Sequence, residues 1–158
     1  MKVLIIGLGK IGLLYDYKTR EFNLTHSQSF SKNKNFNLIG GVDNNISKLK
    51  LFEKKFKVPG FKNVDLALKR LDPDLIVIST NTNTHLGIVR KIFSNKIFNK
   101  IILCEKPCGS SIKDIRKIYR ISKKFRSKIY VNYMRSTMNG FNELKDFVMS
   151  NRSSFNGI

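Results

Sequence analysis

The 158 residues of this chain are 41% hydrophobic and 11% aromatic, which is enough for one globular domain with a sizeable core. No apolar run is long enough to cross a bilayer, and Lys10 interrupts the only stretch that resembles a signal peptide, so we expect a cytoplasmic protein without a membrane partner. The net charge of +19 would suit a nucleic-acid-binding protein, but the lysines are spread along the whole chain. We interpret them as solvent-facing helix residues, and nucleic-acid binding is the less favoured alternative.

The first predicted element is a strand over residues 2–6 that runs directly into the motif Gly7-Leu8-Gly9-Lys10-Ile11-Gly12. Gly7 allows a sharp turn, Gly9 lets the backbone approach a pyrophosphate, and Gly12 lets the next segment pack closely on the strand. The phosphates are then expected at the unpaired N–H groups of a helix N-terminus. A glycine-rich turn of some other α/β protein is the alternative, and the strand that begins at residue 2 favours a dinucleotide site.

A second predicted strand, over residues 36–42, ends at Asp43. Between the glycine motif and this strand, residues 13–24 show no helical period, and a helix signal begins at Thr25. Asp43 lies 31 positions after Gly12, where about 20 are usual for a ribose-binding acid, so we interpret the irregular segment as an inserted loop beside the cofactor. A carboxylate at Asp43 would bind the adenosine ribose and repel a 2′-phosphate, which favours NAD over NADP; a helix cap is its alternative role.

The rest of the chain alternates helices with strands. Helices are predicted over residues 46–56, 65–71, 86–93, 110–125 and 141–149, and strands near residue 61 and over 74–79, 101–104 and 129–133. The nearly continuous apolar strand over 74–79 is typical of a parallel sheet covered on both faces. In the helix over 110–125, the spacing predicts a buried side made of Ile112, Ile115, Tyr119, Ser122 and Phe125. The alternation predicts the α/β class, with a right-handed, doubly wound parallel sheet of the Rossmann dinucleotide-binding type.

Polar residues follow two buried strands at their carboxyl ends, where open α/β sheets bind ligands. Thr80, Asn81 and Thr82 follow the first, and their side chains can meet a nicotinamide ribose or cap the next helix. His85, at the start of that helix, is either a packed histidine or a ligand contact. The segment Glu105-Lys106-Pro107 follows the second strand and reaches the same edge.

The two cysteines, Cys104 and Cys108, flank this triplet. With only His26 and His85 elsewhere, they lack the ligand number and spacing of a zinc site. We therefore expect no metal and interpret Cys104 as a buried strand residue.

Together, these motifs resemble those of the Gfo/Idh/MocA family of NAD(P)-dependent sugar oxidoreductases. The matching segments, in the family's order, are Gly7 to Gly12, Thr25-His26, Gly41-Val42-Asp43, Ile78 to Thr82 with His85, and Glu105-Lys106-Pro107. The last triplet, placed after an apolar strand, is the most specific of them. The resemblance implies hydride transfer between a nicotinamide cofactor and a hydroxyl of a sugar or cyclitol.

By the same resemblance, Lys106 is the catalytic lysine that hydrogen-bonds the reacting hydroxyl, where a cation stabilises a developing alkoxide. Glu105 would orient the site, and Pro107 would fix the turn, commonly through a cis peptide. Tyr133 and Arg135 are the expected substrate contacts. The expected cofactor-binding residues are Gly7, Gly9, Lys10, Ile11, Gly12, Asp43, Thr80, Asn81, Thr82, His85 and Glu105.

The resemblance also implies a domain organisation. Residues 1–135 would form the dinucleotide-binding domain, and residues 136–158 a linker helix and the start of a truncated substrate domain. Family members carry a second α/β domain that supplies the acid/base histidine, most substrate contacts and the dimer interface, and neither His26 nor His85 takes that position. We therefore expect a cofactor-binding portion that is inactive alone and is completed by a second domain, a complementing chain or a homo-oligomer. A non-catalytic nucleotide-binding or partner-binding module is the alternative.

Overall fold

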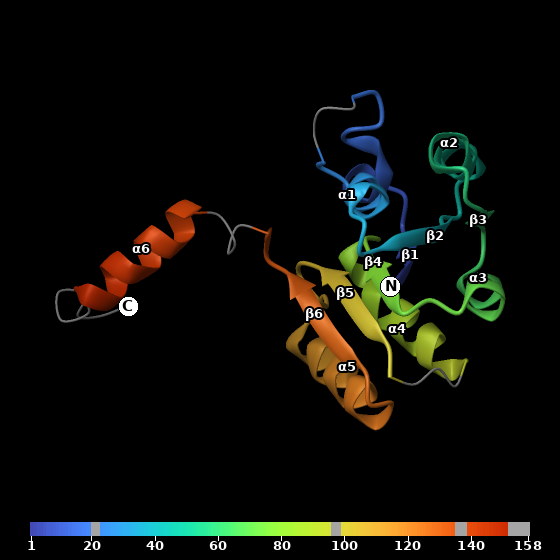
Figure 1. The fold of residues 1–158 in the computed structure, drawn as a ribbon. Helices are drawn as coiled ribbons and strands as arrows, with labels where there is room; N and C mark the ends of the chain where they lie inside the picture. The colour runs from blue at the N-terminus through green and yellow to red at the C-terminus, as the bar shows by residue number, and fades with distance from the viewer. Residues whose placement is uncertain (20–22, 96–98, 135–138, 152–158) are drawn as a thin grey trace.

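Six parallel strands form the sheet of this computed structural model, which describes residues 1–19, 23–95, 99–134 and 139–151 (Figure 1). The strands are β1 (Lys2–Ile6), β2 (Asn37–Val42), β3 (Gly60–Phe61), β4 (Leu75–Ile78), β5 (Ile101–Glu105) and β6 (Lys128–Asn132). They lie in the order β3-β2-β1-β4-β5-β6, and every neighbouring pair is parallel. The predicted doubly wound Rossmann sheet is confirmed, and its strand order reverses between β1 and β4, where such sheets bind ligands.

Helices cover both faces of the sheet (Figure 1). They are α1 (His26–Lys32), α2 (Ile46–Phe56), α3 (Val64–Leu71), α4 (His85–Ser94) and α5 (Ile112–Lys124). The chain also forms α6 (Asn139–Ser150), a π-helical turn over Lys10–Leu14 and a 3-10 turn over Thr82–Thr84. Successive strand residues point to opposite faces. Ile76 thus joins the core under α3, α4 and α5, its neighbour Val77 joins the core under α1 and α2, and both are fully buried. Burial on both faces explains why β4 reads as a continuous apolar run.

The segment after the glycine motif differs from the expected phosphate-facing helix. It forms one π-helical turn over Lys10–Leu14, and the next regular helix begins at His26. The fully buried Asp16 holds the loop between them, because its carboxylate accepts hydrogen bonds from the backbone N–H groups of Leu24 and Thr25 at 2.7 and 2.9 Å. The Thr25 hydroxyl donates a third, at 2.7 Å. The absence of an apolar period after Leu14 therefore ends the helix early, and Asp16 fixes the path of the chain into α1.

The predicted buried side of α5 is partly wrong. Ile112, Ile115 and Tyr119 are 69%, 43% and 60% exposed. Ser122 is buried as predicted, and Ile118, which was not predicted, is buried beside it. Helix α5 covers the sheet at its β6 edge, and Ile115 and Tyr119 border an open groove between α5 and β6. Among the described residues, no further strand lies beyond β6 for the outer side of α5 to pack against, which the spacing of apolar residues could not reveal.

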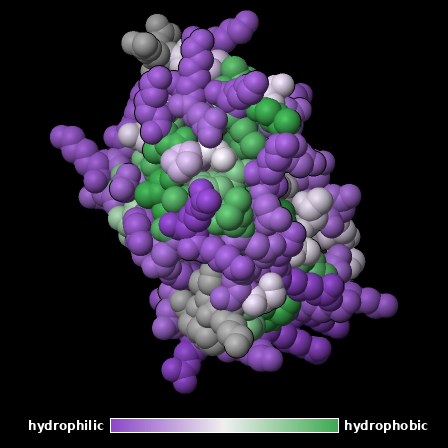
Figure 2. Space-filling model, turned by 90° about the vertical axis from the view of Figure 1, so that its right-hand side faces the viewer, coloured by the Kyte–Doolittle hydropathy of each residue, from purple (hydrophilic) through white to green (hydrophobic). Residues whose placement is uncertain are grey.

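Basic residues occupy the solvent-facing sides of the amphipathic helices. In α2, Leu49 and Phe52 are buried while Lys50 and Lys54 are exposed. Hydrophilic side chains surround a central apolar area on the side of the molecule that carries α2, β3 and α3 (Figure 2).

Helix α6 lies apart from the sheet (Figure 1), and its apolar side chains Phe141, Leu144, Phe147 and Met149 are 45% to 59% exposed.

Candidate functional site

Two adjoining hollows lie at the carboxyl ends of the strands. The β1–β2 pocket has a volume of about 310 Å³, and its wall includes Gly7, Gly9, Asp43, Lys48, Lys62, Ser79, Thr80 and Asn81. The β5–β6 pocket has a volume of about 820 Å³ and is lined by Ile11, Tyr15, Thr80, Glu105, Lys106, Asn132, Tyr133, Met134 and Phe141. Thr80 lines both pockets, so the two lie side by side at this edge of the sheet.

Each glycine of the motif meets a different steric requirement. Gly7 has a φ of +99°, and a Cβ there would lie 2.7 Å from the carbonyl carbon of Ser79. A Cβ on Gly12 would collide with the carbonyl oxygen of Gly7. At Gly9, in contrast, no atom outside the adjacent residues lies within 4 Å of a Cβ position, and Gly9 lines the β1–β2 pocket. The motif thus makes a tight turn whose central glycine leaves room for a ligand to approach the backbone.

The carboxylate of Asp43 lies at the wall of the β1–β2 pocket and has one unused hydrogen-bond acceptor position. Its Oδ2 accepts hydrogen bonds from the Leu8 N–H at 2.8 Å and the Lys48 ammonium at 3.4 Å, and its Oδ1 accepts one from the Asn45 N–H at 2.9 Å. A carboxylate has about four acceptor positions, so one remains for a ligand hydroxyl. The cap of α2 is Asn45, whose side chain accepts from the N–H groups of Ser47 and Lys48. Asp43 is therefore not the helix cap, which was its alternative role.

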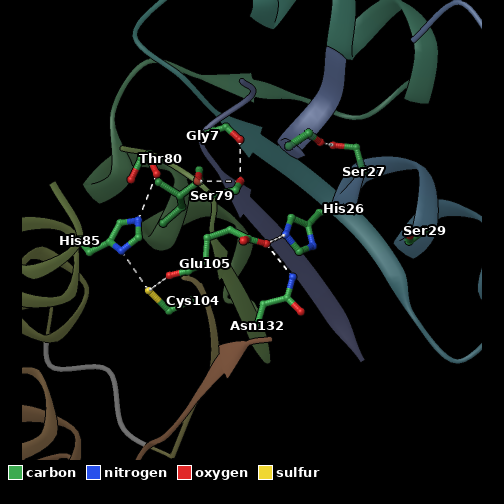
Figure 3. Close-up of polar contacts among 12 residues, drawn as sticks. Gly7, His26, Ser27, Ser29, Ser79, Thr80, His85, Cys104, Glu105 and Asn132 are labelled. Carbon is green, nitrogen blue, oxygen red and sulfur yellow. Dashed lines mark hydrogen bonds and ion pairs between the residues drawn. The ribbon is translucent and has the colours of Figure 1, made fainter. Parts of the chain in front are cut away.

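The carboxylate of Glu105 joins three elements at the β5–β6 pocket (Figure 3). Its Oε1 lies 2.7 Å from Nε2 of His26, at the start of α1, and 2.6 Å from Nδ2 of Asn132, at the end of β6. Burial disfavours the charged carboxylate, but the hydrogen bonds from His26 and Asn132 outweigh it and hold the pKa of Glu105 below its ordinary value. Glu105 is thus an ionised anchor between β5, β6 and α1.

Lys106 follows this anchor and points into solvent-accessible space. Its side chain is exposed and lines the β5–β6 pocket, and the Lys106–Pro107 peptide bond is cis. Among the described residues, no carboxylate forms an ion pair with Lys106. Its ammonium is therefore available to a ligand in this pocket.

His85 lies behind the loop that separates the two pockets. It is fully buried, with Nε2 3.1 Å from the carbonyl oxygen of Thr80 and Nδ1 3.3 Å from the Cys104 sulfur (Figure 3). The hydroxyl of Thr84 donates to the carbonyl oxygen of Asn81 at 2.7 Å and so closes the same loop. His85 lines neither pocket, and its contact supports Thr80 from within.

The structure brings most of the predicted site residues to these pockets. Gly7, Gly9, Asp43, Thr80 and Asn81 line the first, and Ile11, Thr80, Glu105, Lys106 and Tyr133 line the second. Lys10, Gly12, Thr82 and His85 line neither. Arg135 lies outside the described residues.

The two side chains that hold Glu105, His26 and Asn132, were not among the predicted site residues. The sequence placed His26 at a helix start and Asn132 in a strand, but it gave no sign that both meet Glu105, 79 and 27 positions away. A polar residue at the carboxyl end of the last strand is the one signal that could have indicated Asn132. Within the described part of the chain, no group of three or more His, Cys, Asp or Glu residues could hold a metal ion.

These observations fit a dinucleotide. Gly9 leaves backbone open to a pyrophosphate, Asp43 retains an acceptor for a ribose hydroxyl, and the two pockets join at Thr80. In the part of the chain that the structure describes, no helix is both long and apolar enough to cross a membrane.

Comparisons with known proteins agree with this geometry. The rhizopine catabolism protein MocA of Rhizobium meliloti is 30% identical over 73 residues, which are 46% of this chain and 22% of that protein. The WlbA dehydrogenase of Bordetella pertussis, solved in complex with NADH and UDP-GlcNAcA, superposes with a TM-score of 0.80 at 14% identity, over 96% of this chain and 42% of that chain. The scyllo-inositol dehydrogenase of Lactobacillus casei, solved with NAD(H) and scyllo-inositol, gives 0.77 at 19% identity with the same coverage.

The two structural matches establish the fold, and the chain spans less than half the length of each of these relatives. The family assignment comes from the family model of oxidoreductases with an NAD-binding Rossmann fold, which matches residues 1–133. The chain therefore belongs to the Gfo/Idh/MocA oxidoreductase family and contains its NAD-binding Rossmann domain.

Proposed function

We propose that this chain is the cofactor-binding part of an oxidoreductase that transfers hydride between NAD and a hydroxyl group of a sugar or cyclitol. The position of Lys106 carries the proposal: its side chain lines the larger pocket, and Thr80 connects that pocket to the one that holds Asp43. The UDP-GlcNAcA and scyllo-inositol bound to two relatives support a polyhydroxylated substrate.

Lys106 acts on the substrate oxygen in this proposal. The bound nicotinamide supplies the hydride acceptor. The Lys106 ammonium donates a hydrogen bond to the reacting hydroxyl and stabilises the negative charge that grows on its oxygen as the proton leaves. Because no described carboxylate pairs with Lys106, its charge is not offset by a neighbour.

Glu105, His26 and Asn132 serve as positioning residues. Lys106 follows Glu105 directly, so the two hydrogen bonds to Oε1 of Glu105 fix the backbone from which the lysine projects. The side chains of His26 and Glu105 are only 10% and 14% exposed, which limits competition from water.

Asp43 provides the preference for NAD. Its free acceptor position would bind an adenosine ribose hydroxyl, and its charge would repel a 2′-phosphate. Lys48 and Lys62 line the same pocket and oppose that repulsion, so the preference over NADP is expected to be moderate.

A second component completes the active site in this proposal. His26 is engaged by Glu105, and His85 by Thr80 and Cys104, which leaves neither described histidine to serve as the general base. We propose that residues 1–135 bind the dinucleotide, that residues 136–158 lead toward the substrate domain, and that the base comes from that domain or from another chain.

The test is NADH binding without turnover. The 158-residue chain is titrated with NADH and NADPH by fluorescence and calorimetry, and then assayed for NAD reduction with scyllo-inositol. We expect saturable binding of NADH, weaker binding of NADPH, and no reduction above background. The substitution Lys106→Met should leave the NADH affinity within about twofold, because the lysine acts on the substrate rather than on the dinucleotide.

Two results would contradict the proposal. Absence of saturable NADH binding up to about 1 mM, the upper end of ordinary enzyme affinities, would remove the cofactor role. Robust NAD reduction by the chain alone would show that no second component is needed.

A further inference from the structure

Tyr15 is an exposed tyrosine in the β5–β6 pocket and was not among the predicted site residues. Its side chain is 59% exposed and lines that pocket together with Lys106. Within residues 1–19, 23–95, 99–134 and 139–151, the Tyr15 side chain makes no hydrogen bond and no aromatic contact. The nearby Tyr17 differs, because its hydroxyl donates to the carbonyl oxygen of Leu51 at 3.3 Å. The Tyr15 ring is therefore available to a ligand in the pocket.

The π-helical turn over Lys10–Leu14 brings Tyr15 to this pocket. The Tyr15 N–H donates to the carbonyl oxygen of Lys10 at 3.0 Å, which is the five-residue spacing of a π-helix. Ile11, four positions before Tyr15, lines the same pocket, whereas Leu13 between them is fully buried. The turn thus presents Ile11 and Tyr15 together on the side that faces the pocket. Single π-helical turns are frequent at functional sites.

The backbone that follows Tyr15 is fixed by contacts with other segments. The buried carboxylate of Asp16 accepts a hydrogen bond from the Thr25 N–H at 2.9 Å. The ammonium of Lys55, in α2, donates to the carbonyl oxygens of Asp16 and Tyr17 at 3.0 and 3.1 Å. Tyr15 therefore projects from a backbone that is already ordered, which reduces the conformational entropy lost when its side chain contacts a ligand.

The position of Tyr15 relative to a dinucleotide follows from the other residues of the two pockets. Gly9 leaves room for a pyrophosphate, and the turn that ends beside Tyr15 begins at the next residue. Asp43 retains its acceptor for the adenosine ribose in the β1–β2 pocket. The nicotinamide, at the other end of the molecule, is then expected in the adjoining β5–β6 pocket, which Tyr15 lines with Lys106.

We propose that the ring of Tyr15, with Ile11 beside it, packs against the nicotinamide ring of bound NADH and keeps it next to Lys106. Aromatic and aliphatic side chains can cover the flat face of such a ring, and an aromatic pair adds to the stabilisation by burial. The ring of Tyr15 makes this contact, so the hydroxyl is not required. The inference deepens the proposed function and rests on its cofactor-binding part.

The test compares NADH with ADP-ribose, a fragment of the dinucleotide that lacks the nicotinamide. Calorimetry measures both dissociation constants for the 158-residue chain and for Tyr15→Ala. We expect Tyr15→Ala to raise the NADH dissociation constant by about threefold to tenfold and to leave that of ADP-ribose within about twofold. Because ADP-ribose keeps the contacts of the β1–β2 pocket, its unchanged affinity also shows that the variant is folded.

Two further variants serve as controls. Tyr15→Phe keeps the ring, so its NADH dissociation constant should stay within about twofold of wild type. Tyr119→Ala removes a tyrosine that is 60% exposed, almost the same fraction as Tyr15, but that borders the groove between α5 and β6. This variant should bind both ligands as the wild type does.

The possible outcomes separate this inference from the proposed function. If the wild type binds both ligands and Tyr15→Ala leaves the ratio of their dissociation constants unchanged, the role of Tyr15 is overturned and the cofactor role of the chain stands. Equal weakening of the two ligands would also overturn it, since Tyr15 would then support the fold of the turn. A loss in Tyr15→Phe as large as that in Tyr15→Ala would refute the ring contact. If the wild type binds neither ligand, the proposed function fails and this inference fails with it.

Discussion

Removal of the Asn132 amide tests the anchor beneath Lys106. Its Nδ2 donates to the Glu105 carboxylate at 2.6 Å, and the Glu105 side chain is only 14% exposed. A hydrogen bond to a charged group contributes about 1.5–3 kcal/mol, so Asn132→Ala should lower the free energy of unfolding by that amount. For a chain of this size, the loss corresponds to a fall of about 3–12 °C in Tm.

A matched pair elsewhere in the chain provides the control. Asn95 donates to the Asp65 carboxylate at 2.8 Å, but the Asp65 side chain is 35% exposed, so water can replace the amide. Asn95→Ala should therefore cost about 0.5–1 kcal/mol. Urea unfolding followed by far-UV circular dichroism measures both variants. Equal losses for the two would refute the claim that burial strengthens the Asn132 contact.

The loss at Asn132 should depend on pH in one direction. The pKa of Glu105 in the folded protein lies below its ordinary value of 4.5. Its ionised form therefore stabilises the fold at pH values above 4.5, and this contribution is lost as the pH falls through the lowered folded pKa. The difference between wild type and Asn132→Ala should persist at pH values above 4.5 and shrink as the pH falls below 4.5. A difference that grows on acidification would contradict the assignment of Glu105 as the charged acceptor.

Three further substitutions probe the pockets and the loop. Gly9→Val should leave Tm unchanged, because the backbone at Gly9 (φ −76°, ψ −156°) suits a β-branched residue and the space around its Cβ position is open. The same substitution should weaken NADH binding by roughly tenfold or more in a fluorescence titration. Lys48→Ala should raise the ratio of the NADPH to the NADH dissociation constant by about threefold to tenfold, since Lys48 offsets the charge of Asp43 in the same pocket. Asp16→Ala should lower the free energy of unfolding by about 2–3 kcal/mol in urea, because the buried N–H and hydroxyl of Thr25 and the N–H of Leu24 lose their acceptor.

The order of elements could be predicted from the sequence because each signal is local. Apolar β-branched runs predicted the strands, and helical spacing predicted α2 and α4. The glycine motif with Asp43 predicted the ligand site at the ends of β1 and β2. The nearly continuous apolar run over residues 74–79 also indicated a parallel sheet covered on both faces. The same local rules failed for α5, where burial of Ile112 and Tyr119 depended on whether a neighbour exists beyond β6.

The contacts that assemble the site were decided only by the tertiary structure. Glu105 meets His26 and Asn132 because parallel strands and their flanking helices bring three distant segments to one sheet edge, and no spacing along the chain encodes that meeting. His85 was turned inward for the same reason, since α4 packs against β5 and sets its ring between Thr80 and Cys104. The sequence by itself thus determined which residues reach the carboxyl edge of the sheet. The packing of helices on the two faces of the sheet decided which of these residues line a pocket and which support the residues that line it.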